Sequence, residues 1–291
     1  MREKTAKREG LVAGLVLCGL MGSLGSWALD QPPAPPSPQL TCTEIEAFLR
    51  TARIGTQRDI PRGVTNPKRA TLDDGKRKHD AGIKRVHVSK TSFSTDRGTE
   101  LNFKDWWEFD VAGYELAKIL ELNMVPPYVE RKVGGSSAAL TWWVEGMLEV
   151  ERRRQDLKPP DVESFNRQMY VVRVFTQLIA NSDPNLTNFV ITPDWQVWMF
   201  DFSRAFRARK DLPSPKDLVQ CDRKLLTRLR ELDKALLRKR LKPYVSDQEM
   251  DGLLARRDKI VAFFDQEIAR KGEAAVLFDL PRSGQPCGVG L

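Results

Sequence analysis

The feature that most restricts the fold of this chain is the segment 181–206, NSDPNLTNFVITPDWQVWMFDFSRAF. Two short apolar runs, 188–192 and 195–202, flank Pro193-Asp194 and predict a β-hairpin. A long helix with an apolar stripe is expected just before it, starting at an Asp161 N-cap. Because a helix, a polar loop and a hairpin follow one another, the loop and the end of the second strand should lie close together.

Three oxygen-bearing side chains mark that place. Asp183 and Asn188 lie five residues apart on the loop, and Asp201 ends the second strand. A kinase catalytic loop has an Asp and an Asn at this separation. Phosphoryl transfer needs hard oxygen ligands for magnesium and a carboxylate to orient the attacking hydroxyl. The pattern predicts Asp183 as the base and Asn188 and Asp201 as metal ligands. The alternative is that these residues only cap and turn the chain.

The rest of the chain divides into a β-rich half and a helical half. The patterns predict a helix at 43–53 with a Thr43/Glu46 capping box, a hairpin at 69–88, a helix at 104–120, strands at 128–133 and 139–144, and helices at 216–241 and 246–271, the last with a Ser246/Glu249 capping box. This order indicates an α+β fold with a β-rich N-lobe, a helical C-lobe and a cleft between them.

The N-terminal segment has the features of a targeting sequence. Residues 1–28 have the basic start, apolar run and small-residue cleavage site of a signal peptide, and residues 29–40 are a Pro-rich linker. We therefore expect an N-lobe at 41–147, a C-lobe at 148–275 and a loose tail at 276–291. The protein is expected to be exported, periplasmic or secreted, or else anchored by an uncleaved N-terminal segment. Cleavage leaves Cys42, Cys221 and Cys287, which predict one disulfide of open pairing and one free thiol.

The segments NSDPNLTN and DFS resemble the catalytic loop and the following metal-binding motif of the bacterial phosphatidylinositol 3- and 4-kinase-like and HipA-type kinases. DVAGYELAKILELNMVPPYVERKV and LTWWVEG also resemble runs of that group. The resemblance covers roughly 63–207 and is strongest to an exported bacterial subgroup. It implies a two-lobed protein-kinase-like fold that uses ATP and Mg²⁺.

The resemblance also implies roles for further residues. Lys84 aligns with the lysine that binds the nucleotide phosphates, and Asp110 aligns with its acidic partner on a helix, with Glu108 pointing elsewhere. The loop GVTNP, which begins at Gly63, would cover the phosphates with backbone N–H groups. Glu145 and Gly146 fall in the hinge that hydrogen-bonds adenine. Solvated lysines and an ordinary turn are the alternatives for Lys84 and the loop.

Three departures from that pattern leave two functions open. Asp110 has a shorter reach than the usual Glu, Pro184 stands where the family has Arg, and Ser203 stands where Gly is usual. The first hypothesis is an atypical kinase that phosphorylates a hydroxyl of a protein, a lipid or a small molecule. The alternative is a catalytically degenerate pseudokinase, an exported nucleotide-binding or scaffolding module.

Charge suggests one more kind of partner. The net charge is +8, and in residues 222–242 nine basic residues face three acidic ones. This helix could contact anionic lipid, or it could be a solvated face packed through its leucines. Nucleic-acid binding is not expected, because no stacking or groove-reading motif accompanies the charge. With only two His, a histidine metal site or a Ser-His-Asp triad is not expected either.

Overall fold

The computed structural model describes residues 40–60, 66–95 and 98–281. The predicted signal peptide, nearly all of the linker, most of the loop at Gly63 and most of the tail lie outside the described residues. Among the helices of the described part, none is long and apolar enough to cross a membrane. Cys42 is disulfide-bonded and Cys221 is a buried free thiol, which identifies the free cysteine that the sequence left open.

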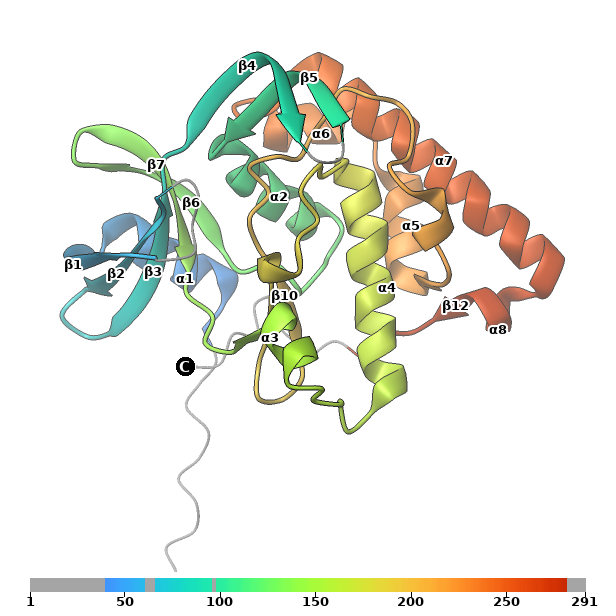
Figure 1. The fold of residues 1–291 in the computed structure, drawn as a ribbon, viewed down its shortest axis with the longest axis horizontal. Coiled ribbons are helices and arrows are strands. Elements are labelled where there is room, and N and C mark those ends of the chain that lie inside the picture. Colours follow the sequence, from blue (N-terminus) through green and yellow to red (C-terminus); the bar gives the residue numbers. More distant parts are fainter. Residues whose placement is uncertain (1–39, 61–65, 96–97, 282–291) are drawn as a thin grey trace, which may run out of the picture. The chain divides into compact units, whose positions relative to one another are not determined.

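The N-terminal half is built on an antiparallel sheet with the order β1-β2-β3-β7-β6 (Figure 1). Its strands are β1 (Arg53–Asp59), β2 (Lys68–Asp73), β3 (Lys78–Lys84), β6 (Tyr128–Val133) and β7 (Ser136–Trp142). Asp74 closes the β2–β3 turn by accepting the N–H groups of Lys76 and Arg77, and Gly75 supplies the positive φ that the turn requires. Helix α1 (Cys42–Thr51) packs on β6 and β7 and shares an apolar core with the sheet.

A second hairpin follows β3 before the next helix. It consists of β4 (His87–Thr95) and β5 (Gly98–Trp106) and leads into α2 (Glu108–Ile119). The sequence predicted a helix from residue 104, but the extended strand continues to Trp106 because β5 pairs with β4 along its whole length. Helix α2 packs against β6 and β7, and it belongs to the apolar core of the helical half.

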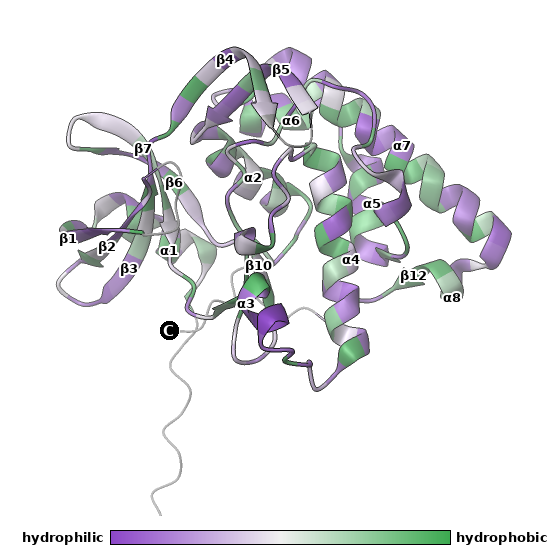
Figure 2. Cartoon of the chain, viewed as in Figure 1, coloured by the Kyte–Doolittle hydropathy of each residue, from purple (hydrophilic) through white to green (hydrophobic). Residues whose placement is uncertain are grey.

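The C-terminal half is mostly helical. It contains β8 (Met147–Leu148), α3 (Glu149–Arg154), α4 (Val162–Ile179), η1 (Leu186–Asn188), β9 (Phe189–Ile191), β10 (Val197–Met199), η2 (Pro215–Asp217), β11 (Cys221–Asp222), α5 (Arg223–Glu231), α6 (Lys234–Leu241), α7 (Asp247–Lys271), α8 (Glu273–Val276) and β12 (Leu277–Phe278). Hydrophilic and hydrophobic residues alternate around α4 and α7, and the apolar stripes face the core (Figure 2). The mixed architecture, a β-rich N-terminal half and a helical C-terminal half, is the predicted fold class.

Two further local predictions differ from the structure. The first helix is capped by Thr41 with Glu44 rather than Thr43 with Glu46, and Glu46 instead receives Tyr114 and Lys118. The expected helix 216–241 begins only at Arg223, after η2 and β11, and it is interrupted because Asp233 accepts the N–H of Leu236 and starts α6. The capping box of Ser246 and Glu249 and the Asp161 N-cap of α4 are present as predicted.

Candidate active site

Lys84 joins three elements of the fold. It ends β3, and its Nζ lies 3.2 Å from Asp110 Oδ2 on α2 and 2.5 Å from Asp201 Oδ1 after β10. The Nζ also lies 3.3 Å from the hydroxyl of Ser203. The Lys84 side chain is 13% exposed and that of Asp110 is fully buried. A charge is removed from water here only because it is paired on two sides.

Asp110 links this lysine to the main chain of the DFS segment. Its Oδ1 accepts the N–H of Phe202 at 2.6 Å, while its Oδ2 faces Lys84. The shorter Asp side chain therefore spans the distance that the sequence comparison left in doubt. Glu108 points elsewhere, as the helix geometry predicts, and its Oε1 lies 2.8 Å from His87 Nδ1.

The charges of this cluster shift one another's titration. Burial raises the pKa of Asp110, the nearby Asp201 raises it further, and Lys84 offsets only part of the shift. Burial would also raise the pKa of Asp201, but Lys84 and the Ser203 hydroxyl outweigh burial and lower it. Burial disfavours the charged form of Lys84, but the carboxylates of Asp110 and Asp201 outweigh this effect and raise the pKa of Lys84. Lys84 is therefore the fixed positive charge of the site.

The loop that carries Asp183 and Asn188 is held by its own amides. Asn181 Oδ1 accepts the N–H of Asp183 at 3.0 Å, and Asn188 Nδ2 donates to the main-chain oxygen of Asp183 at 3.1 Å. The carbonyl of Asn188 accepts the N–H of Phe200 at 3.1 Å, which ties the loop to the end of β10. The turning role that Asx residues often have is thus present, but it leaves the Asp183 carboxylate about two-fifths exposed.

Arg204 connects Asp183 to the second hairpin. Its Nε donates to Asp105 Oδ2 at 2.9 Å, and its Nη1 lies 3.5 Å from Asp183 Oδ2. The carbonyl of Arg204 accepts both the N–H and the hydroxyl of Ser182. Burial would lower the pKa of Arg204, but Asp105, Asp183 and Asp201 together raise it. Arg204 thus lies close to both candidate catalytic carboxylates.

Sequence reasoning missed Arg204 and the hairpin that supports it. Within β5, Leu101, Phe103 and Asp105 alternate in the manner of a strand, and Gly98 marks its turn. Those signals predict a strand, but no local pattern predicts that Asp105 meets a residue 99 positions later.

Strained backbone also gathers here. Ala180, Asp201 and Phe206 have φ values of 46°, 62° and 55°, which only Gly adopts freely. Ala180 ends α4 just before the loop, and Asp201 carries the carboxylate that meets Lys84. Such strain persists where surrounding structure enforces it, and it is common at functional sites.

The predicted hinge has a structural role of its own. The exposed Glu145 forms an ion pair with Arg69 of β2, and Arg69 stacks over the Trp143 ring. Gly146 lies so close to β9 that a Cβ would stand 2.5 Å from the carbonyl oxygen of Ile191. The segment between β7 and β8 therefore contacts β2 through Glu145 and β9 through Gly146. Gly63, the remaining predicted phosphate contact, lies outside the described residues.

Comparisons with known proteins identify the fold. No family model and no curated protein matches the chain. Among solved structures, the chain is similar to hydra Fam20, determined with sugar, at a TM-score of 0.60 and 13% identity, over 82% of this chain and 92% of that one. It is also similar to the Golgi casein kinase, at a TM-score of 0.57 and 12% identity, over 84% of this chain and 80% of that one. A structure of that kinase with Mn/ADP bound gives the same TM-score of 0.57 and 12% identity, over 83% of this chain and 80% of that one. The chain has a protein-kinase-like fold.

Proposed function

We infer that this chain is an atypical kinase, which transfers a phosphoryl group from a metal-bound nucleotide, ATP in the simplest case, to a hydroxyl group. The observation that carries the proposal is the buried Lys84, held between Asp110 of α2 and Asp201 of the DFS segment. A solvated strand lysine needs no such arrangement, and a buried lysine that only stabilises the fold needs no exposed second carboxylate. The protein-kinase-like fold, and the Mn/ADP of one structural neighbour, support the same proposal.

The metal-ligand pair of the proposal is Asn188 and Asp201. The carboxylate contacts of Asp201 among the described residues all fall on Oδ1, and the side chain is two-fifths exposed. In the described part of the chain, no group of three or more His, Cys, Asp or Glu side chains is arranged to hold a metal ion. This donor set fits Mg²⁺ or Mn²⁺, which take one or two protein oxygens and complete their shell with phosphates and water. Bound there, the ion would neutralise charge on the phosphates.

The remaining roles follow from the contacts of each side chain. Lys84, kept in place by Asp110, would bind the nucleotide phosphates. Asp183 would accept the proton of the acceptor hydroxyl as its oxygen attacks the terminal phosphorus, and the nucleoside diphosphate would leave with the electrons of the broken bond. Backbone groups at Glu145 and Gly146, and the loop at Gly63, would bind the adenine and the phosphates. Most of the rate would come from positioning and charge neutralisation.

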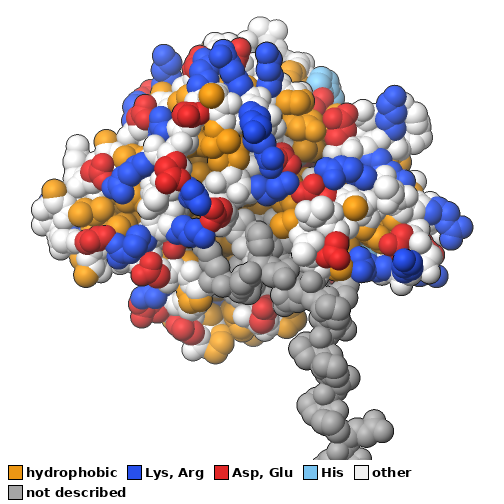
Figure 3. Space-filling model, turned by 180° about the vertical axis from the view of Figure 1, so that it is seen from behind, with side chains coloured by type: hydrophobic (Ala, Val, Ile, Leu, Met, Phe, Trp, Pro, Cys, Tyr) orange, Lys and Arg blue, Asp and Glu red, His pale blue; other side chains and the backbone are white. Residues whose placement is uncertain are grey.

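The finer assignments extend this proposal. Within the kinase-like proteins we extend the proposal to the phosphatidylinositol 3- and 4-kinase-like and HipA-type group, which the segments NSDPNLTN and DFS resemble, with a protein, a lipid or a small molecule as the acceptor. The disulfide at Cys42 supports a location outside the cytoplasm. On the face shown in Figure 3, Lys and Arg side chains are interspersed with Asp and Glu.

Nucleotide binding and phosphoryl transfer test the proposal separately. Calorimetry with ADP or ATP, with and without Mg²⁺ or Mn²⁺, is compared between the wild type, Asp201→Asn and the control Asp211→Asn, whose side chain is 89% exposed. We expect metal-dependent binding that Asp201→Asn abolishes and Asp211→Asn preserves. Autophosphorylation or ATP hydrolysis should fall about a hundredfold in Asp201→Asn. Metal-dependent binding without any transfer would identify a pseudokinase, and no binding at all would refute the proposal.

A further inference from the structure

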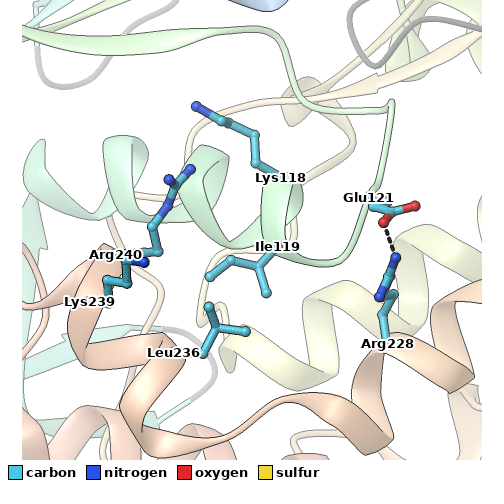
Figure 4. A pocket seen from close by; sticks show the side chains of 7 residues that line it. All are labelled: Lys118, Ile119, Glu121, Arg228, Leu236, Lys239 and Arg240. Carbon is cyan, nitrogen blue, oxygen red and sulfur yellow. Dashed lines mark hydrogen bonds and ion pairs between the residues drawn. The ribbon is translucent and has the colours of Figure 1, made fainter.

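A concave site lies away from Lys84, between α2 and α6. The pocket has a volume of about 280 Å³. Figure 4 shows its floor and its rim. The floor is formed by Ile119 and Leu236, and the rim carries four cationic side chains, Lys118, Arg228, Lys239 and Arg240. Three helices contribute to it, because Arg228 comes from α5.

Four cations line the pocket beside the carboxylate of Glu121, and three of them, Lys118, Arg228 and Arg240, have carboxylate partners at or beside the rim. Glu121 is the acidic residue of the lining, and it already pairs with Arg228 and Lys224. Lys239 forms no ion pair with any described residue of the chain, and its side chain is exposed. Its neighbour Arg240 uses one of its five donors on Glu115, at 2.9 Å. Donors for an anion are therefore present and uncommitted.

This concentration of charge exceeds what a solvated helix face requires. Any polar residue satisfies an exposed helical position, and like charges brought together in a hollow repel one another. Here α2, α5 and α6 each direct a cation to the rim, above an apolar floor that strengthens their field. Lys118 is fixed in place by Glu46 at 2.7 Å and Glu115 at 3.3 Å, so one rim cation is preorganised. An anionic ligand would pair with Lys239 and with the remaining donors of Arg240.

We propose that the α2–α6 pocket binds a small molecule bearing phosphate or sulfate groups. Arg side chains present paired donors that match phosphate oxygens, and Lys adds a point charge. A volume of about 280 Å³ suits a compact phosphorylated ring rather than an acyl chain. The same phosphate could be free or carried on a lipid headgroup, which would give the basic segment 222–242 a defined point of contact.

The position of the pocket connects it to Lys84. Lys118 and Ile119 end α2, and Asp110 lies eight residues earlier on the same helix, about 12 Å along its axis. Since α2 and α6 pack together, a ligand that bridges them fixes α2 and, through Asp110, the position of Lys84. The ligand should therefore change nucleotide affinity. This coupling rests on the proposed function, whereas the binding does not.

Binding is tested by calorimetry in EDTA with inositol hexakisphosphate as the probe and inositol as the uncharged control. We expect binding to one site, weakened by added salt, about tenfold weaker in Lys239→Ala and lost in Lys239→Glu. The matched control is Lys242→Ala, which removes an exposed lysine at the end of α6 that does not line the pocket. Its affinity should stay within about twofold. No binding, or an equal loss in both alanine variants, would overturn the proposal, because diffuse surface charge would then suffice.

Two further measurements separate the source and the coupling. Vesicles with phosphatidylinositol 4-phosphate that bind the wild type but not Lys239→Glu would identify a membrane headgroup, and binding of the free probe alone would identify a soluble ligand. The affinity for ADP with Mn²⁺ should change at least about fivefold when the probe is saturating. An unchanged affinity would overturn the coupling. Absence of ADP binding would instead count against the proposed function and leave the pocket's ligand standing.

Discussion

Replacing Lys84 with methionine should expose the energetic role of the buried charge cluster. Lys84→Met keeps the length of the side chain but removes its charge. Asp110 is fully buried and loses its cation, while Asp201 is two-fifths exposed and can be hydrated. Removing one partner of a buried ion pair typically costs about 3–5 kcal/mol of unfolding free energy, and Asp110 should account for most of it.

The loss should depend on pH, and its sign follows from Asp110. Its pKa is already raised by burial, and it should rise further without Lys84, whereas an unfolded Asp titrates near 3.9. Between these two values the folded variant binds a proton that the unfolded chain does not. Its unfolding free energy therefore falls as pH rises, by at most about 1.4 kcal/mol per unit. The loss relative to the wild type should therefore be smallest at pH 5, where Asp110 is protonated and only the contact of Lys84 with Asp201 is missing, and largest at pH 8.5.

Urea denaturation in EDTA at pH 5, 7 and 8.5 measures this difference. The double variant Lys84→Met/Asp110→Asn should recover at least half of the loss at pH 8.5, because Asn can still accept the N–H of Phe202. Lys76→Met, in the exposed β2–β3 turn, should leave stability within about 0.5 kcal/mol. An equal loss at all three pH values, or a double variant no better than Lys84→Met, would refute the reasoning, because lost packing rather than an unpaired carboxylate would then be the cause.

Three further substitutions test the packing around the site. Gly113→Ala should destabilise by about 1–3 kcal/mol in urea denaturation, because its Cβ would stand 2.5 Å from the Phe202 ring; a gain, as helix propensity alone predicts, would contradict this. Arg256→Met should lower the unfolding free energy by at least about 3 kcal/mol in the same assay, because the buried guanidinium donates to three main-chain carbonyls. Burial also lowers the pKa of Arg256 to about 10. A loss below about 1 kcal/mol would show that water replaces the guanidinium. Arg204→Lys should lower kcat for ATP hydrolysis more than it changes KM, because Lys cannot hold Asp105 and Asp183 together; equal nucleotide affinity by calorimetry is the check on folding.

Local signals predicted much of the helical half. Asp161 caps α4, and Ser246 with Glu249 caps α7, because a side chain that satisfies free N–H groups acts within four residues. The same reasoning placed the first cap two residues late. Both Thr41 and Thr43 have a Glu three positions on, and tertiary contacts decided between them by drawing Glu46 into the core beside Tyr114.

The candidate site residues could be proposed from the sequence where they lie close together along the chain. Asp183, Asn188 and Asp201 occupy one continuous segment, so their spacing alone indicated a shared place. The resemblance supplied Lys84 and Asp110, whose pairing spans 26 positions and has no periodic signature. The resemblance also suggested the hinge at Glu145 and Gly146, but it gave no structural reason for Gly146, which depends on the approach of β9 from 45 residues later.

Arg204 changes the meaning of one departure from the family pattern. At Pro184 the chain lacks the Arg expected after the catalytic Asp, which from sequence alone favours a degenerate enzyme. In the folded chain a guanidinium still lies beside Asp183, contributed by Arg204 and anchored to Asp105 of the second hairpin. Loss of a cation at one position therefore does not leave the carboxylate without one. Pro184 ceases to favour a pseudokinase, and the argument for one rests on whether Asp110 and Ser203 permit transfer.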